Sequence, residues 1–136
     1  MGCLYSKHNL TICTFENTPT FSFNKSTYQA KVVNVYDGDT IWVAIKHLNK
    51  YIKIKIRLEG IDTPELGTKN FKEKEKAIDS RDYLKHLINN RIIKLKCGNF
   101  DKNGILLGKI YFKNICINNI MIETGHAIAY DSCRDY

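Results

Sequence analysis

The sequence predicts an α+β fold that is mainly β, a five-stranded barrel with two to three helices. Three observations support this class. Apolar and polar residues alternate over residues 51–58, as in a strand with one buried face. Asp-Gly at residues 37–38 separates two apolar runs, which is a strong hairpin signal. Apolar residues recur at helical spacing over residues 71–89, between two groups of expected strands.

The first group of strands is expected at residues 28–35, 40–45 and 51–58. On the third strand, Lys53, Lys55 and Arg57 share one face and the isoleucines share the other. The basic face is either solvated or meets phosphates. Solvation is the simpler interpretation for the two lysines, whereas Arg57 adjoins an acidic loop.

A helix over residues 71–89 follows this group and ends at Asn89-Asn90. The later elements are expected as a strand at 91–97, a polar loop at 98–104, a strand at 105–112 and a tail at 127–136. Between the last strand and the tail, Asn118 is expected to cap a short helix that Gly125 closes. Three strands, a helix, two strands and a final helix suit a closed barrel of the OB type.

The chain has 136 residues, which fits one domain, expected over residues 28–130 between an N-terminal arm (1–27) and a short tail (131–136). Lys and Arg number 21 against 14 acidic residues, so the net charge is +7. Such a charge favours a polyanionic partner, either nucleic acid or an anionic membrane surface, although it also serves solubility.

The five cysteines are odd in number and none is spaced as CxxC, which argues against a disulfide framework or a zinc site. We therefore expect a reducing, intracellular compartment. No apolar run is long enough for a membrane span, and the N-terminus lacks the apolar core of a signal peptide.

The N-terminus begins MGCLYSK, which matches the pattern for N-myristoylation at Gly2. Cys3 lies beside Gly2 and is a candidate for S-palmitoylation. One myristoyl chain holds a protein on a membrane only marginally, whereas two acyl chains anchor it stably. The pattern therefore predicts a membrane-associated protein, and a chance match is the alternative.

Residues 35–65 contain two clusters of carboxylates joined by expected strands. Carboxylates that a sheet brings together suit a hard divalent cation, and Arg57 at the end of a strand suits a phosphate. Asp is also favoured in turns for its own backbone hydrogen bonds. That is the preferred interpretation for Asp37, whereas Asp39 and Asp62 are candidate metal ligands.

Four ordered blocks resemble the staphylococcal nuclease-like (thermonuclease) domains, and the resemblance spans residues 28–130. These blocks are VYDGDT (35–40), RLEGIDTPE (57–65), DKNGILLGKIY (101–111) and the segment 118–127. The resemblance implies an OB-fold barrel and a calcium-dependent phosphodiesterase acting on DNA or RNA.

By the same resemblance, Asp39 and Asp62 would bind one calcium ion together with the backbone carbonyl of Thr63. Glu65 would act as the general base or position the attacking water, and Arg57 would hold the scissile phosphate. These residue types suit the chemistry, because calcium prefers oxygen ligands and a carboxylate can take a proton from water.

The third block departs from the family pattern. Lys102 would contact a nucleotide phosphate, but Ile105 stands where the family has its second catalytic arginine. Lys102 or Lys109 would compensate only in part, because lysine lacks the planar fork of arginine. Asn103 also replaces the usual tyrosine, which weakens the case for nucleotide stacking.

Two functions remain open. One is a calcium-dependent nuclease, slowed by Ile105, that acts on single-stranded nucleic acid. The other is a catalytically inactive module that binds nucleic acid or protein. The retained set of Asp39, Arg57, Asp62 and Glu65 favours the enzyme, and Ile105 favours the binding module. In either case we expect a monomer.

Overall fold

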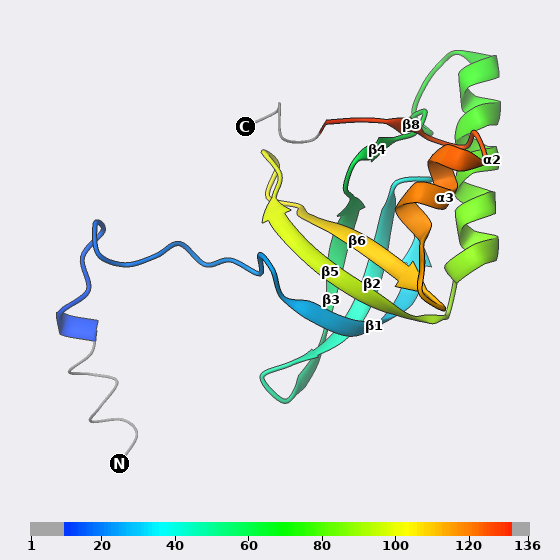
Figure 1. Cartoon of the computed structure of the whole chain (residues 1–136). Coiled ribbons are helices and arrows are strands. Elements are labelled where there is room, and N and C mark those ends of the chain that lie inside the picture. Colours follow the sequence, from blue (N-terminus) through cyan, green and yellow to red (C-terminus); the bar gives the residue numbers. More distant parts are fainter. Residues whose placement is uncertain (1–9, 132–136) are drawn as a thin grey trace.

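The computed structural model describes residues 10–131, and Figure 1 labels its helices and strands. The larger elements are β1 (Thr27–Val35), β2 (Thr40–His47), β3 (Lys50–Leu58), α2 (Phe71–Ile88), β5 (Ile92–Phe100), β6 (Leu106–Phe112) and α3 (Ile117–Glu123). Three two-residue strands complete the set: β4 (Ile61–Asp62), β7 (Ile115–Cys116) and β8 (Ile128–Ala129).

Five of the described strands form a closed barrel. Antiparallel pairings run in the order β3-β2-β1-β5-β6, and a parallel pairing of β3 with β6 closes the cylinder. Closure sets Arg57 opposite Leu107 in the register. Gly108 makes this close approach possible, because a Cβ there would lie 2.7 Å from Leu95 Cδ1 and 3.1 Å from Ile56 Cγ2. The predicted OB-type barrel is confirmed.

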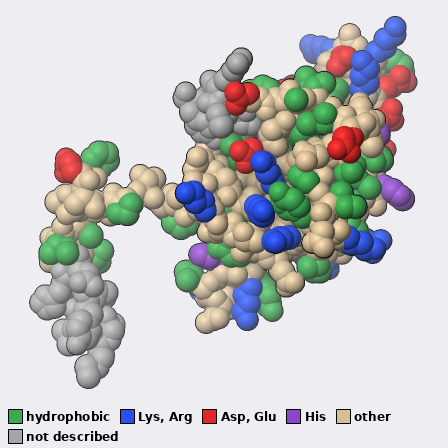
Figure 2. All heavy atoms as spheres, in the orientation of Figure 1, with side chains coloured by type: hydrophobic (Ala, Val, Ile, Leu, Met, Phe, Trp, Pro, Cys, Tyr) green, Lys and Arg blue, Asp and Glu red, His purple; other side chains and the backbone are tan. Residues whose placement is uncertain are grey.

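The core fills the barrel and extends beneath the two helices, which lie on the same side of it (Figure 1). The strands bury alternate residues, as the period-two pattern requires. The largest fully buried side chains of the barrel include Ile41, Ile56, Leu95 and Ile110, and α2 contributes Leu84 and Ile88. Lysines are frequent among the outward-facing residues of the strands, and Figure 2 shows several Lys and Arg side chains, in blue, on the face in view.

The expected strands and the long helix lie where the sequence places them, but three details are wrong. Residues 98–100 were expected in a loop and instead extend β5 as far as Phe100, which pairs with Leu106 beyond an irregularity in the register. Residues 128–129 were expected in a tail and instead form β8, which pairs with β4. Both segments are recruited by distant partners and not by their own propensity.

The third error concerns Asn118, which does not cap α3. The N-cap residue is Cys116 and makes no side-chain cap bond, while Asn118 lies inside the helix and is buried. Its amide nitrogen donates to the carbonyls of Glu59 (2.9 Å) and Gly108 (3.1 Å), and its Oδ1 accepts from Ile110 N (3.0 Å). Asn118 therefore joins α3 to β6 and to the turn after β3.

The barrel core reaches upstream of residue 27. Phe23 is 9% exposed, belongs to the core and makes an edge contact with Tyr28. Residues 10–20 run away from the barrel (Figure 1), whereas the ring of Phe21 lies 4.8 Å from that of Phe23 and 6.3 Å from that of Phe100. The predicted acylation sites Gly2 and Cys3 lie outside the described residues. Within the described part of the chain, no helix is both long and apolar enough to cross a membrane.

Candidate active site at the barrel mouth

The turn between β1 and β2 sets Asp39 in a buried, hydrogen-bonded position. Asp39 Oδ2 accepts from the backbone N–H (3.1 Å) and the hydroxyl (3.0 Å) of Thr63, and Oδ1 accepts from the Thr40 hydroxyl (2.9 Å). Gly38 lets this turn pack closely, because a Cβ there would lie 2.7 Å from Ser80 Cβ on α2 and 2.9 Å from Thr63 Cγ2. The turn, the segment after β4 and α2 thus fix one another.

Arg57 links the two candidate metal ligands. Its Nη1 lies 3.3 Å from Asp39 Oδ2 and its Nη2 lies 3.1 Å from Asp62 Oδ1. Nη1 also donates to the backbone carbonyls of Ile61 (2.9 Å) and Leu58 (3.2 Å). The guanidinium is therefore held in one orientation by the strand end and the turn that follows it.

The carboxylates of Asp37, Asp39 and Asp62 lie close enough to affect one another's ionisation. Burial and the neighbouring Asp39 raise the pKa of Asp37 to about 7, although its Oδ1 accepts a hydrogen bond from Asp39 N (3.0 Å). Burial and the charge of Asp39 also raise the pKa of Asp62, and Arg57 opposes this shift. Two carboxyl groups beside Asp39 thus resist ionisation, which is the condition that a bound cation relieves.

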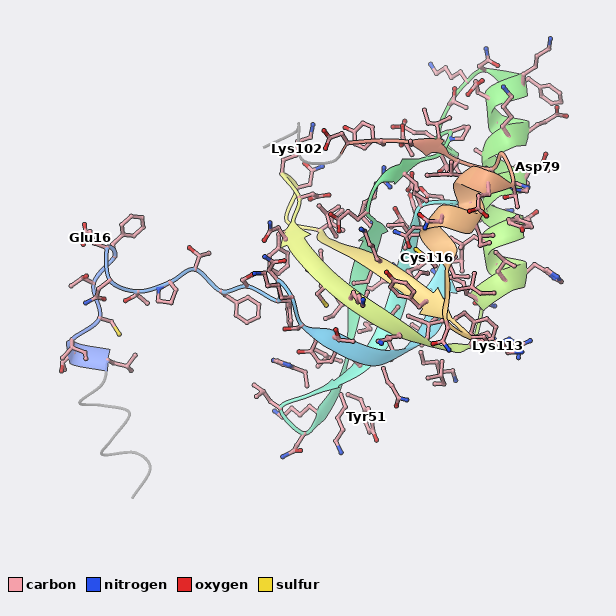
Figure 3. All side chains as sticks on the ribbon, viewed as in Figure 1. Glu16, Tyr51, Asp79, Lys102, Lys113 and Cys116 are labelled. Carbon is pink, nitrogen blue, oxygen red and sulfur yellow. The ribbon has the colours of Figure 1, made fainter. Side chains whose placement is uncertain are left out.

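A pocket of about 340 Å³ opens beside Arg57. Its lining comes from three parts of the chain and consists of Arg57, Asp62, Glu65, Asp101, Lys102, Asn103, Leu107 and Tyr130. Figure 3 shows Lys102 at the tip of the loop between β5 and β6. An anion in this pocket would face basic groups on two sides, with the exposed carboxylate of Glu65 at its edge.

The loop that carries Lys102 is ordered by its own hydrogen bonds. Asp101 Oδ1 accepts from the N–H groups of Asn103 (2.8 Å) and Ile105 (2.9 Å). The backbone of Asp101 also donates to the carbonyl of Ile105 (2.7 Å). These hydrogen bonds hold the loop in a tight turn. The chain has Asn103 and Ile105 there, where the family resemblance implies a tyrosine and an arginine.

The donor set fits a hard cation. Asp39, Asp62 and the carbonyl of Thr63 offer only oxygen, and burial together with the charge of Asp39 raises the pKa of Asp37 and of Asp62. The two carboxylates are at present joined through Arg57. Among residues 10–131, no group of three or more His, Cys, Asp and Glu side chains converges as a preformed cage.

Most of the predicted site residues come together at this mouth. Arg57, Asp62, Glu65 and Lys102 line the pocket, and Asp39 and Thr63 lie directly behind Arg57 and Asp62. Lys109 is exposed on β6 and is not part of the lining. Ile105 is half-buried just before β6, and its side chain does not line the pocket either.

Sequence reasoning missed two contributors. Tyr130 lines the pocket, because β8 pairs with β4 and Tyr130 N donates to the Gly60 carbonyl (2.9 Å). Tyr130 lies three residues beyond the fourth block (118–127) and at the end of the resemblance, which was the available signal. Asp37 was interpreted as a turn residue, which its hydrogen bond to Asp39 N supports, but its raised pKa makes it part of the site's charge balance.

Comparisons with known proteins point to the same family. A family model described as "Staphylococcal nuclease homologue" matches residues 55–136. Two proteins of Oryza sativa subsp. japonica, named Probable staphylococcal-like nuclease CAN2 and CAN3, are 37% and 36% identical to the chain over 75 residues. An uncharacterized protein of Bacillus anthracis is 29% identical over 105 residues, 75% of this chain and 47% of that protein.

The similarity to the rice proteins covers 55% of this chain but only 19% and 18% of their own lengths. The chain thus spans about a fifth of those relatives. The family match begins at residue 55, so β1, β2 and Asp39 lie upstream of it, although the structure closes the barrel with these strands.

Proposed function

The chain belongs to the staphylococcal nuclease homologue family, and from this premise we propose that it hydrolyses phosphodiester bonds in DNA or RNA with one calcium ion. The observation that carries the proposal is the position of Arg57. It bridges Asp39 and Asp62 and lines a pocket that also contains Glu65 and Lys102. A family label without this arrangement would not support catalysis.

Asp39, Asp62 and the Thr63 carbonyl would hold the calcium ion. When bound, the ion polarises a phosphoryl oxygen and offsets the charge that develops on it. Thr40 and Thr63 keep the Asp39 carboxylate oriented through hydrogen bonds of 2.9–3.1 Å. The Asp39 carboxylate is therefore already oriented, whereas Arg57 would have to release Asp62 for a cation to bridge the two carboxylates.

Arg57 would orient the scissile phosphate. Its planar fork matches two phosphate oxygens, and four contacts already fix its direction. Glu65 is exposed at the pocket and would accept the proton of the attacking water. Lys102, on the opposite loop, would contact a flanking phosphate of a single-stranded substrate.

The presence of isoleucine at position 105, where the family has an arginine, determines the rate of hydrolysis that we expect. An arginine that stabilises developing charge on a phosphoryl group contributes roughly a hundred-fold or more. The isoleucine side chain makes no such interaction, and Lys109 does not line the pocket. We therefore expect a slow enzyme.

The same position motivates the second candidate, a module that binds nucleic acid or protein without turnover. Ile105 is the observation in its favour. The two candidates make opposite predictions for restoration of the arginine, which provides the deciding experiment.

Ile105→Arg should raise calcium-dependent cleavage of denatured DNA by about a hundred-fold, because a second guanidinium would support the transition state. Cleavage of a labelled oligonucleotide at millimolar calcium measures this gain. Glu65→Gln is the control and should remove the activity in both backgrounds. Absence of cleavage by wild type and Ile105→Arg alike would favour the binding module.

We also propose that the protein is a monomer tethered to a membrane by acylation of Gly2 and Cys3. The support is the sequence pattern alone. Mass spectrometry of protein co-expressed with an N-myristoyltransferase measures the modification, and an unmodified Gly2 would remove this part of the proposal.

A further inference from the structure

The outer face of β1–β3 carries a basic and aromatic surface that the proposed active site does not use. We call it the Trp42 face, and it consists of Asn34, Tyr36, Trp42, Lys46, Lys53 and Lys55. The alternation of the strands explains its composition. Ile41, Val43 and Ile45 point inward and are buried, so Trp42, Ala44 and Lys46 point outward.

The aromatic rings of this face lie within reach of lysine ammonium groups. Lys53 Nζ lies 5.5 Å from the centroid of the Trp42 ring, and Lys55 Nζ lies 6.0 Å from it. Lys55 Nζ is also 4.9 Å from the ring of Tyr36, which is 54% exposed. A half-buried tryptophan is thus combined with two cations, the exposed Lys53 and the half-buried Lys55.

A hollow lies beside Trp42. The pairing of β1 with β2 shifts register between Val32 and Asn34, so both Val33 and Asn34 are exposed. Such a bulge re-aims side chains at the surface. The result is a depression of about 590 Å³ lined by Val33, Asn34, Trp42, Ala44 and Lys53.

The positive charge of this face is not balanced locally. From residue 27 to residue 58 the acidic residues are Asp37 and Asp39, and both belong to the turn at the proposed active site. Among the described residues, Lys46, Lys53 and Lys55 form no ion pair. Other acidic residues gather on α2, as Glu73, Glu75, Asp79 and Asp82. The face therefore presents an uncompensated attraction for an anion.

This face is continuous with the proposed active site. Lys53, Lys55 and Arg57 occupy alternate positions of β3, so they follow one another at steps of about 6.6 Å on one side of the strand. The row runs from the β2–β3 hairpin, where Figure 3 labels Tyr51, to the mouth where Lys102 lies. A polyanion held by Arg57 would meet the two lysines as its next cations.

We propose that the Trp42 face is a second binding site for single-stranded nucleic acid, in which a base stacks on Trp42 and Lys53 and Lys55 hold flanking phosphates. The proposal rests on the proposed function, because it extends the path of the same substrate away from Arg57. Aromatic side chains that stack bases, combined with cations that follow the backbone, are the general solution for binding single strands.

The shape of the face favours nucleic acid over an anionic membrane. Trp42 lies beside a hollow between strands and is flanked by lysines, and an unpaired base can enter such a depression. A flat lipid surface would instead be met by protruding apolar side chains, and Leu48 and Tyr51 are of that kind but lie at the tip of the β2–β3 hairpin, outside the Trp42 face. The membrane is therefore the competing outcome of the test.

The test uses the full chain in EDTA, so that binding is measured without cleavage. Trp42 is the single tryptophan of the protein, and its fluorescence reports directly on this face. Oligothymidylate should quench the fluorescence, because a stacked base contacts the indole. Phosphatidylserine vesicles and inorganic polyphosphate are the comparison ligands, and neither should produce the same quenching.

Three variants test the residues by the anisotropy of labelled oligothymidylate. Trp42→Leu should weaken binding about tenfold, and Trp42→Phe should restore most of it, because phenylalanine still stacks. A plot of log affinity against log salt concentration has a negative slope. Lys53→Gln/Lys55→Gln should make this slope less steep by about 1.4, because two phosphate contacts are lost. Lys94→Gln/Lys96→Gln on β5 is matched in charge and also removes a lysine–aromatic contact, so it is the control and should change the slope less.

The proposal is overturned if saturating oligothymidylate leaves the fluorescence of Trp42 unchanged, if the β5 control loses as much as the β3 variant, or if only vesicles alter the fluorescence. Failure of the proposed nuclease gives a different result, because stacking on Trp42 would then persist without cleavage at millimolar calcium. Conversely, cleavage with unaltered KM in Trp42→Leu would retain the nuclease and remove the second site.

Discussion

At the scale of single residues, Arg57 combines structural and chemical roles. It contacts two carboxylates and two backbone carbonyls and also lines the pocket. Loss of this side chain would leave Asp39 buried without its cation, so stability and activity would fall together. Glu65 and Ile105 are the better positions for testing catalysis, because Glu65 is exposed and Ile105 contributes only backbone hydrogen bonds.

Asp37 gives a prediction for the dependence of stability on pH. Its pKa is raised from 3.8 to about 7, so the folded protein keeps a proton that the unfolded chain releases near pH 4. Stability from this group is therefore complete below pH 4 and is lost as the pH rises towards 7. Asp37→Asn should be more stable than wild type at pH 8 by about 1 kcal/mol, after allowance for solvent screening.

Urea denaturation at pH 4 and pH 8, followed by circular dichroism in EDTA, measures this difference. Asn can still accept the hydrogen bond from Asp39 N, so the turn is preserved. Glu75→Gln, at an exposed position of α2 that makes no ion pair among the described residues, is the control. An Asp37→Asn variant whose advantage is the same at both pH values would contradict the prediction.

At the scale of elements, the sequence predicts the strands and turns that depend on neighbouring residues, and it misses the strands that form only by pairing with distant segments. Alternation over residues 51–58 locates β3, and Asp-Gly locates the turn between β1 and β2, because both patterns depend on neighbours in the chain. The end of β5 contains Gly98 and Asn99, which have low β propensity. These residues become strand because β6 lies beside them, and no local pattern carries that information.

For the candidate site too, the sequence indicates which residues take part but not the contacts that distant packing creates. Residue type and position indicate Asp39, Arg57 and Asp62, and the family resemblance adds Thr63. They do not show that Arg57 bridges both carboxylates, because the bridge requires the β1–β2 turn to pack on the segment after β3. Tyr130 was missed for a similar reason, since it reaches the pocket through the pairing of β8 with β4.

Asn118 provides the prediction at this scale. Asn118→Ala should lower the free energy of unfolding by about 2 kcal/mol, because the Ile110 N–H and the Glu59 carbonyl lose their hydrogen bond to Asn118 and the Gly108 carbonyl keeps only its bond from Glu59 N. Asn119→Ala is the matched control at the next, exposed position of α3 and should change it by less than about 0.5 kcal/mol. Urea denaturation measures both, and equal effects would show that the three hydrogen bonds do not tie α3 to the barrel.

At the scale of the whole molecule, calcium should stabilise the fold. The proposed ligands Asp39, in the β1–β2 turn, and Asp62, in β4, come together only in the folded barrel, so the unfolded chain cannot bind the ion equally well. Calcium at a hundred times its Kd should raise the free energy of unfolding by about 2.7 kcal/mol.

Urea denaturation in calcium and in EDTA measures this increment, independently of any cleavage. Asp62→Asn should abolish it, since Asp62 is a proposed ligand whose side chain is 45% exposed and tolerates the change. An increment that survives in Asp62→Asn would place the ion elsewhere. Magnesium provides the comparison, because it is smaller and dehydrates reluctantly.

The parallel contact of β3 with β6 also determines when the site can exist during synthesis of the chain. The acidic half of the mouth comes from residues 37–65, whereas Lys102, Leu107 and Tyr130 follow much later. Pairing between such distant segments has a large loop-closure entropy and forms late. A nascent chain on the ribosome therefore carries the carboxylates and Arg57 without the opposite wall of the pocket. The proposed nuclease would therefore meet the messenger RNA being translated with a complete site only after β8 has been made.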